Sequence, residues 1–324
     1  MVLSTPPRSA RGSVDRAPDQ MPASAEPAHH RKARPNIAAY VFMSPWMAGA
    51  ALLTIGPMLY SLYLSFTDYD LFSAPHWIGL GNYRRMAGDS ELWASAWVTL
   101  RYVFLSSPLK LALALVVALL LVKPRRGLGF YRSAYYAPSL LGASVSIALV
   151  WRALFTDHGA VDRGLGAIGI HTGGWIDNPD YALLVLVILA VWQFGAPMVI
   201  FLAGLKQIPQ ELYEAAALDG AGRWRSFTSI TLPMLSPVLF FNLVLEIINA
   251  FQAFTGAFII SGGRGGPANS TLFYTLYLYQ QGFTDFHMGY ASALAWVLLA
   301  VIGVATLIVF RTANFWVFYT AEEK

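Results

Sequence analysis

The chain has 324 residues, of which 56% are hydrophobic and only 12% are charged, about half the charged fraction of an ordinary soluble domain. This composition excludes a typical soluble globular protein and indicates a chain that resides in lipid. The absence of cysteine excludes disulfides, cysteine-ligated zinc and thiol catalysis.

Residues 1–36 are rich in Pro, Ala, Ser and Arg and contain no apolar run, so we expect a disordered tail. The adjacent pair His29 and His30 stands without further ligands, and we expect no metal site there. The apolar stretch from Tyr40 to Phe66 is too long for the hydrophobic region of a cleaved signal peptide. It therefore predicts a retained signal-anchor helix.

Six stretches of the chain are long and apolar enough to cross a bilayer, which takes about 20 residues. We predict an all-α membrane protein with six transmembrane helices, at about residues 40–66, 98–122, 134–155, 181–205, 236–260 and 288–311. The connections are too short for a separate external domain, and no internal repeat is visible. Residues 37–324 should therefore form one membrane domain.

The distribution of basic residues predicts the orientation, because cytoplasmic loops carry the excess of Lys and Arg. One side holds fifteen basic residues, in the tail, in the loops at 123–132 and 206–235, and at the C-terminal end. The other side holds four: Arg84, Arg85, Arg163 and Arg264. We therefore expect both termini and the 206–235 loop in the cytoplasm. Because the charge lies beside the spans rather than along a groove, we expect no nucleic-acid partner.

The loop between the fourth and fifth spans reads EAAALDGAGRWRSFTSITLP from Glu214 to Pro233. Pro209 suits the start of a helix, residues 210–219 favour helix, and Gly220 suits the left-handed position just past a helix end. The run of three alanines leaves room for another surface to approach the backbone, and the carboxylate can pair with a partner group. An amphipathic helix that lies on the membrane surface is the alternative interpretation.

This loop matches the pattern E-A-A-x3-G-x9-I-x-L-P at every specified position: Glu214, Ala215, Ala216, Gly220, Ile230, Leu232 and Pro233. It resembles the cytoplasmic loop of permease subunits in bacterial ATP-binding-cassette (ABC) importers, in which a short helix docks on the ATPase subunit. The segments FLAGLKQIP, GGPANSTLFYTLYLYQQGF and MGYASALAW are similar to carbohydrate importers, so the resemblance covers roughly residues 190–300.

The resemblance implies the type I ABC importer permease fold and a location in the bacterial inner membrane. It also implies four kinds of partner: a second permease subunit, two ATPase subunits, an external solute-binding protein and a sugar substrate. Within the family, the chain is similar to the first, maltose-permease type of subunit. It has six predicted spans rather than eight, however, and no large external domain. Smaller permeases for multiple sugars or for alginate or pectin fragments are therefore the better comparison.

No G-x4-G-K-[ST] phosphate-binding loop occurs in the chain. The glycines between Gly262 and Pro267 lie on the predicted external side, where they suit a tight turn. ATP and Mg²⁺ are therefore expected on the partner ATPase, and no bound cofactor is expected on this chain. We assign no catalytic residue and expect a non-catalytic permease.

Polar side chains inside spans tend to face a bundle interior or a water-filled cavity. Asn242, Glu246 and Asn249 fall on one stripe of the fifth span, and such groups can hydrogen-bond sugar hydroxyls. The other candidates for a substrate path are Trp192, Gln193, Gln252, Tyr290, Ser292 and Trp296. In the structural alternative, Glu246 pairs with the second permease, or with Arg101 or Lys110, and holds helices together.

Arg101, Lys110 and Arg152 lie in or near the spans and suggest attraction of an acidic, uronate-containing oligosaccharide. The alternative is that these cations extend to the interface or pair internally.

Two other functions compete with ATP-driven import. An ion-driven secondary transporter would show inverted repeats and interrupted helices at matching positions, and neither is visible in the sequence. A membrane-embedded enzyme would need clustered carboxylates, a histidine metal site or a nucleophile with its base. Glu246 stands alone, and His158, His171 and His287 lie in external loops or at a span edge.

Overall fold

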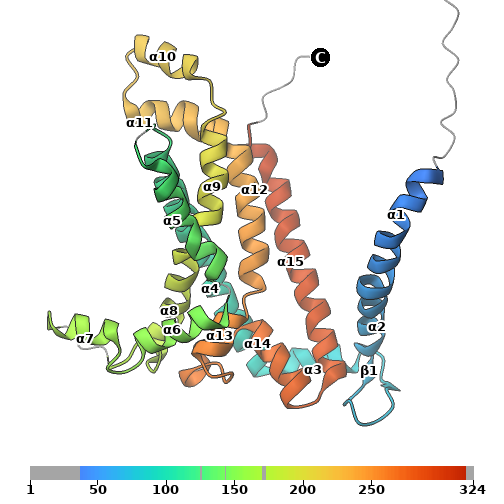
Figure 1. Ribbon diagram of the computed structural model, residues 1–324. Coiled ribbons are helices and arrows are strands. Elements are labelled where there is room, and N and C mark those ends of the chain that lie inside the picture. Colours follow the sequence, from blue (N-terminus) through green and yellow to red (C-terminus); the bar gives the residue numbers. More distant parts are fainter. Residues whose placement is uncertain (1–36, 125, 143, 170–172, 319–324) are drawn as a thin grey trace, which may run out of the picture. The chain divides into compact units, whose positions relative to one another are not determined.

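The computed structural model describes residues 37–124, 126–142, 144–169 and 173–318 (Figure 1). The predicted tail, residues 1–36, lies outside these residues. The chain divides into two units, Met1–Thr54 and Ile55–Lys324, which are described separately. In the first unit the described residues form α1 (Ile37–Ala50) and the start of a π-helical turn (Ala51–Ile55).

The second unit is helical apart from loops and, within its described part, one pair of two-residue strands. β1 (Thr67–Asp68) pairs antiparallel with β2 (His76–Trp77). The longer helices are α2 (Gly56–Leu64), α3 (Gly81–Gly88), α4 (Ser90–Leu121), α5 (Leu128–Leu141), α6 (Val145–Phe155), α7 (Ala160–Gly166), α8 (Pro179–Trp192), α9 (Gly195–Leu205), α10 (Gln210–Leu218), α12 (Leu232–Phe251) and α15 (Met288–Trp316). The shorter ones are α11 (Arg223–Ser226), α13 (Thr255–Ile260) and α14 (Tyr274–Tyr279).

The prediction of an all-α membrane protein is confirmed, and the six predicted spans agree with the four to six candidate spans of the described residues. By length and composition, the described residues contain four helical stretches that could cross a membrane: Tyr40–Leu64, Ser90–Leu121, Arg223–Ile260 and Met288–Trp316. Two further spans are present if a bent group of helices is taken as one span. The first group is α5 with α6 and α7, and the second is α8 with α9.

The second span begins earlier than expected, at Ser90 rather than near residue 98. Asp89 caps this helix, because its Oδ1 accepts a hydrogen bond from the Leu92 amide at 3.0 Å. The cap satisfies a backbone donor that the helix start would otherwise leave without a partner. The apolar content of the sequence indicates only the part of this helix from about residue 98 onward.

Three predicted spans are interrupted rather than continuous. The 134–155 stretch contains two helices, α5 and α6, and the second is capped by Ser144, which accepts from the Ile147 amide at 3.3 Å. The 181–205 stretch contains α8 and α9, which are bent by 42°. The 236–260 stretch contains α12, which ends at Phe251, and the separate helix α13.

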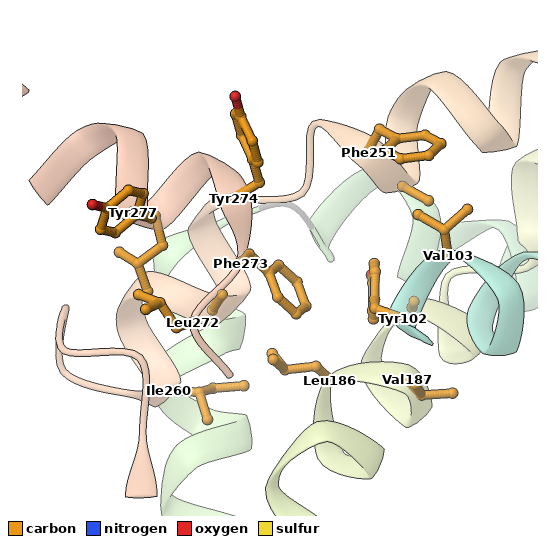
Figure 2. Packing of buried hydrophobic residues seen from close by; sticks show 14 of the residues in the cluster. Tyr102, Val103, Leu186, Val187, Phe251, Ile260, Leu272, Phe273, Tyr274 and Tyr277 are labelled. Carbon is orange, nitrogen blue, oxygen red and sulfur yellow. The ribbon is translucent and has the colours of Figure 1, made fainter. Parts of the chain in front are cut away.

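Helix α4 lies at the centre of the second unit and packs against α8, α9 and α12. Figure 2 shows one buried cluster, in which the Phe273 ring points toward Tyr102 with ring centroids 4.6 Å apart. A second cluster surrounds Met198, Phe201 and Leu235. Within this unit, α10 and α11 lie at the end where α15 finishes, whereas α3, α13 and α14 lie at the other end (Figure 1).

Two glycines of α15 provide a matched test of this packing. A Cβ at Gly289 would collide with the backbone carbonyl oxygen of Thr67, whereas Gly303 faces open space. We expect Gly289→Ala to destabilise the protein by about 1–3 kcal/mol, because backbone cannot yield as a side chain can. Gly303→Ala should leave stability unchanged or raise it, since alanine favours helix. Melting temperatures in detergent check this, and equal values for the two variants would contradict the packing of α15 on β1.

Candidate functional site

A cavity of about 490 Å³ lies among α4, α5, α8, α9 and α12, and α13 and Phe273, just before α14, also line it. Its polar lining includes Lys110, Ser139, Gln193, Asn242, Glu246, Asn249, Gln252 and Thr255. Its aromatic lining consists of Tyr102, Phe254 and Phe273. A cavity that combines amides, one ion pair and aromatic faces suits an uncharged polar ligand with apolar faces, such as a sugar.

The polar stripe predicted on the fifth span lies in this cavity wall. Asn242, Glu246 and Asn249 all belong to α12 and all line the cavity. The side-chain amide nitrogen of Asn242 is buried and has no hydrogen-bond partner among the described residues. Because a buried donor without a partner is costly, this nitrogen is available to a ligand or to water.

The carboxylate of Glu246 is paired within the chain. Its Oε2 lies 2.9 Å from Nζ of Lys110 on α4, and both side chains are largely buried. This ion pair joins α4 to α12, as the structural alternative for Glu246 anticipated. The two charges cancel, so these residues give the cavity polarity without net charge.

The other two cations that suggested an acidic substrate lie elsewhere. Arg101 is exposed, and its guanidinium lies over the ring of Trp97 at 5.1 Å. Arg152 donates a hydrogen bond to the Ile259 carbonyl at 3.3 Å. It lines a second cavity of about 300 Å³ together with Arg264 and Asp177.

Several predicted substrate-path residues are not among those that line the larger cavity. Trp192 packs against Trp151, with ring centroids 5.3 Å apart. Tyr290 and Ser292 are buried near the start of α15, and Trp296 is half-buried farther along it. The cavity instead has aromatic faces from Tyr102, Phe254 and Phe273, which the sequence analysis did not single out because phenylalanine is common throughout apolar spans.

Tyr290 belongs to a junction centred on Asp89. The Oδ2 of Asp89 accepts hydrogen bonds from the hydroxyls of Tyr277 and Tyr290, both at 2.5 Å. The Arg85 guanidinium lies 4.1 Å from the Tyr290 ring centre. Burial raises the pKa of Asp89, but the hydrogen bonds from Tyr277, Tyr290 and the Leu92 amide, together with the charge of Arg85, bring the pKa below its ordinary value. The ionised carboxylate therefore joins the starts of α4 and α15 to α14.

The E-A-A loop folds as its residues predict. Glu214, Ala215 and Ala216 lie on α10, and Gly220 follows the helix with φ of +75°. The amide of Ala221 donates to the carbonyl of Ala216 at 2.8 Å, and that of Gly220 donates to Ala217 at 3.1 Å. These two bonds form a Schellman motif, which requires the left-handed residue that glycine supplies.

A second set of contacts joins the loop to α12. Ile230 lies in a π-helical turn (Phe227–Thr231), and Leu232 and Pro233 begin α12. The hydroxyls of Tyr213 and Thr231 lie 2.9 Å apart and tie α10 to this turn. Leu218 and Trp224 are 91% and 75% exposed, so the loop presents apolar side chains at the end of the second unit.

The chain is similar to known membrane transport proteins. The family model described as "Binding-protein-dependent transport system inner membrane component" matches residues 102–317. The chain is 49% identical over 291 residues to the probable ABC transporter permease protein YesP of Bacillus subtilis (strain 168), covering 89% of this chain and 94% of that protein. It is 30% identical over 281 residues to the lactose transport system permease protein LacF of Rhizobium radiobacter, covering 85% and 93%.

A solved structure has a similar fold. It is the crystal structure of a bacterial alginate ABC transporter in complex with an alginate pentasaccharide-bound periplasmic protein. One of its chains matches with a TM-score of 0.73 and 20% sequence identity, covering 86% of this chain and 94% of that one.

The Lys110–Glu246 pair generates a double-mutant prediction. Glu246→Gln or Lys110→Met alone leaves a charge without its partner, and we expect each to destabilise the protein by ~2–4 kcal/mol. The double variant leaves no charge, so it should lose less stability than the sum of the singles. Melting temperatures of the four proteins in detergent measure the coupling. Additive losses would mean that the two groups do not interact in the folded protein.

Proposed function

The chain belongs to the family of binding-protein-dependent transport system inner membrane components, and from this premise we propose that it is the permease subunit of an ATP-driven ABC importer for sugars or oligosaccharides. Its fold is that of type I ABC importer permeases, as predicted. The sugar class is supported by the lactose permease relative and by the polar, uncharged balance of the cavity. The same relationship supports a transport role without covalent chemistry in this chain.

The observation that carries the proposal is the loop of α10 and α11. An exposed helix with three small residues, fixed at its end by a Schellman motif, is suited to receive another protein against its backbone. We infer that α10 docks on an ATPase subunit, which holds the ATP and Mg²⁺. Because the hydroxyl contact between Tyr213 and Thr231 ties α10 to the start of α12, movement of the ATPase would be transmitted to a helix that lines the cavity.

The remaining partners and the orientation follow from the same proposal. A second permease would complete the translocation path, and an external solute-binding protein would deliver the sugar. The position of α10 and α11 at the end where α15 finishes supports a cytoplasmic loop and C-terminus in the bacterial inner membrane (Figure 1). We infer that the cavity residues of α12, together with Gln193 and Gln252, form this subunit's share of the substrate path.

The two cavities suit substrates of different charge, one neutral and one acidic. The cancelled charges of Lys110 and Glu246 favour a neutral oligosaccharide in the larger cavity. One observation favours an acidic oligosaccharide instead: two guanidinium groups, of Arg152 and Arg264, line the smaller cavity. Arg264→Gln should reduce import of an acidic substrate and leave import of a neutral one unchanged.

The first test is purification of the tagged chain from its native membrane with identification of the proteins that accompany it. We expect a second permease and an ATPase with a phosphate-binding loop. Recovery of the chain alone, in detergent that preserves known importer complexes, would support an ion-driven secondary transporter and overturn the proposal.

The coupling role of α10 is tested with Ala216→Glu, which places bulk and charge on the exposed helix. We expect loss of sugar-stimulated ATP hydrolysis by the reconstituted complex, with the melting temperature of the chain unchanged. Ala160→Glu, at the exposed start of α7, is the matched control and should retain stimulation. Normal stimulation in the Ala216→Glu complex would contradict the docking role.

The substrate is tested with the same complex and the binding protein of the system, by comparing ATP hydrolysis in the presence of lactose, maltotriose and digalacturonate. Greater stimulation by a neutral sugar is expected from the charge balance of the larger cavity. Greater stimulation by digalacturonate, lost in Arg264→Gln, would assign the acidic class instead.

A further inference from the structure

A serine of α5 forms hydrogen bonds to the backbone at the break between α8 and α9. Pro197 lies in the first turn of α9 and has no amide hydrogen, so the carbonyl of Gln193 lacks the donor that a continuous helix would supply. The Oγ of Ser139, on α5, donates a hydrogen bond to that carbonyl at 2.9 Å. The same Oγ accepts a hydrogen bond from the Ala196 amide, also at 2.9 Å. One hydroxyl thus satisfies a backbone group on each side of the break.

Two glycines bring α5 close enough for these bonds. A Cβ at Gly195, the first residue of α9, would collide with the backbone carbonyl oxygen of Tyr135 on α5. A Cβ at Gly142, which follows α5, would collide with the side chain of Gln193. The backbone of α5 therefore lies directly against the break, with no side chain between the two.

The break also forms part of the larger cavity wall. Ser139, Gly142 and Gln193 all line the cavity, as do Pro197 and Ile200 of α9. The side-chain amide nitrogen of Gln193 donates to the Leu189 carbonyl at 3.2 Å, which orients the amide within the wall. The angle at which α8 and α9 meet therefore determines where the Gln193 amide and the first turns of α9 face the cavity.

We propose that Ser139 is a positioning residue for substrate: by replacing the hydrogen bond that Pro197 removes and accepting one from the Ala196 amide, it fixes the α8–α9 break and holds Gln193 in the cavity wall. Its effect on substrate rests on the proposed transport function, whereas its effect on the break does not. Because Ser139 bonds to both sides of the break, α5 and the start of α9 move as one unit when the cavity changes shape.

The absence of cysteine in the chain permits a test that uses no sugar. A single Ile200→Cys substitution reports the exposure of α9 to the cavity, through its rate of reaction with a water-soluble methanethiosulfonate reagent. In this background and in the purified full complex, Ser139→Ala should change the rate about tenfold, because two partly buried hydrogen bonds are lost. Ser139→Thr, which keeps the hydroxyl, should stay within about twofold of the parent.

Two further variants separate this role from a general loss of stability. Ser95→Ala removes a buried hydroxyl elsewhere, which bonds within α4 to the Leu92 carbonyl, and should stay within about twofold of the parent. Pro197→Ala restores an amide donor for the Gln193 carbonyl, so it should return the Ser139→Ala rate toward that of the parent. Equal rates for the Ser139→Ala and Ser95→Ala proteins, or no rescue by Pro197→Ala, would overturn the inference.

The effect on substrate is measured with the sugar that stimulates the wild-type complex most among lactose, maltotriose and digalacturonate. Ser139→Ala should raise the half-saturating sugar concentration about tenfold and leave the maximal ATPase rate within about twofold. An unchanged half-saturating concentration with a lower maximal rate would overturn the positioning role. If none of the three sugars stimulates the complex, the proposed substrate class fails, and the thiol-reaction series still decides whether Ser139 holds the break.

Discussion

Backbone hydrogen bonding within the membrane is the constraint on which the rest of this structure depends. Lipid offers no partner for an exposed amide or carbonyl, so each helix end at membrane depth must find one within the protein. Ser139 supplies such partners at the α8–α9 break, and Ser144 supplies one at the start of α6. The helix interruptions are tolerated because these side chains are present.

The same constraint explains why the cavity contains polar groups that are already paired with one another. An ionised carboxylate facing lipid would be strongly unfavourable, whereas Glu246 beside Lys110 keeps its charge compensated. The buried amide nitrogen of Asn242, in the same wall, has no hydrogen-bond partner among the described residues. A site that binds and then releases a sugar needs such a combination: some polar groups held in place by the protein, and others left for the ligand.

Local features were predictable from the sequence, and distant pairings were not. The α10 helix and the left-handed Gly220 depend on neighbouring residues, and both were confirmed. The bonds from Ser139 to Gln193 and from Tyr277 to Asp89 join residues 54 and 188 positions apart. A single sequence carries no signal for such pairs, so Tyr290 was assigned to the substrate path although it serves the Asp89 junction. The stripe on α12 was predictable because helical periodicity places its three residues on one face.

The interrupted helices also bear on the competing transport mechanism. Inverted-repeat transporters place their broken helices at corresponding positions of two halves, which for six spans means the first and fourth, second and fifth, or third and sixth. Here the interrupted spans among the described residues are the third, the fourth and the fifth, and no two of these correspond. The third and fourth lie beside each other in the fold, since α5 packs against α9. The breaks in the third and fourth spans therefore belong to one shared wall of a single cavity rather than to a pair of symmetry-related ion sites.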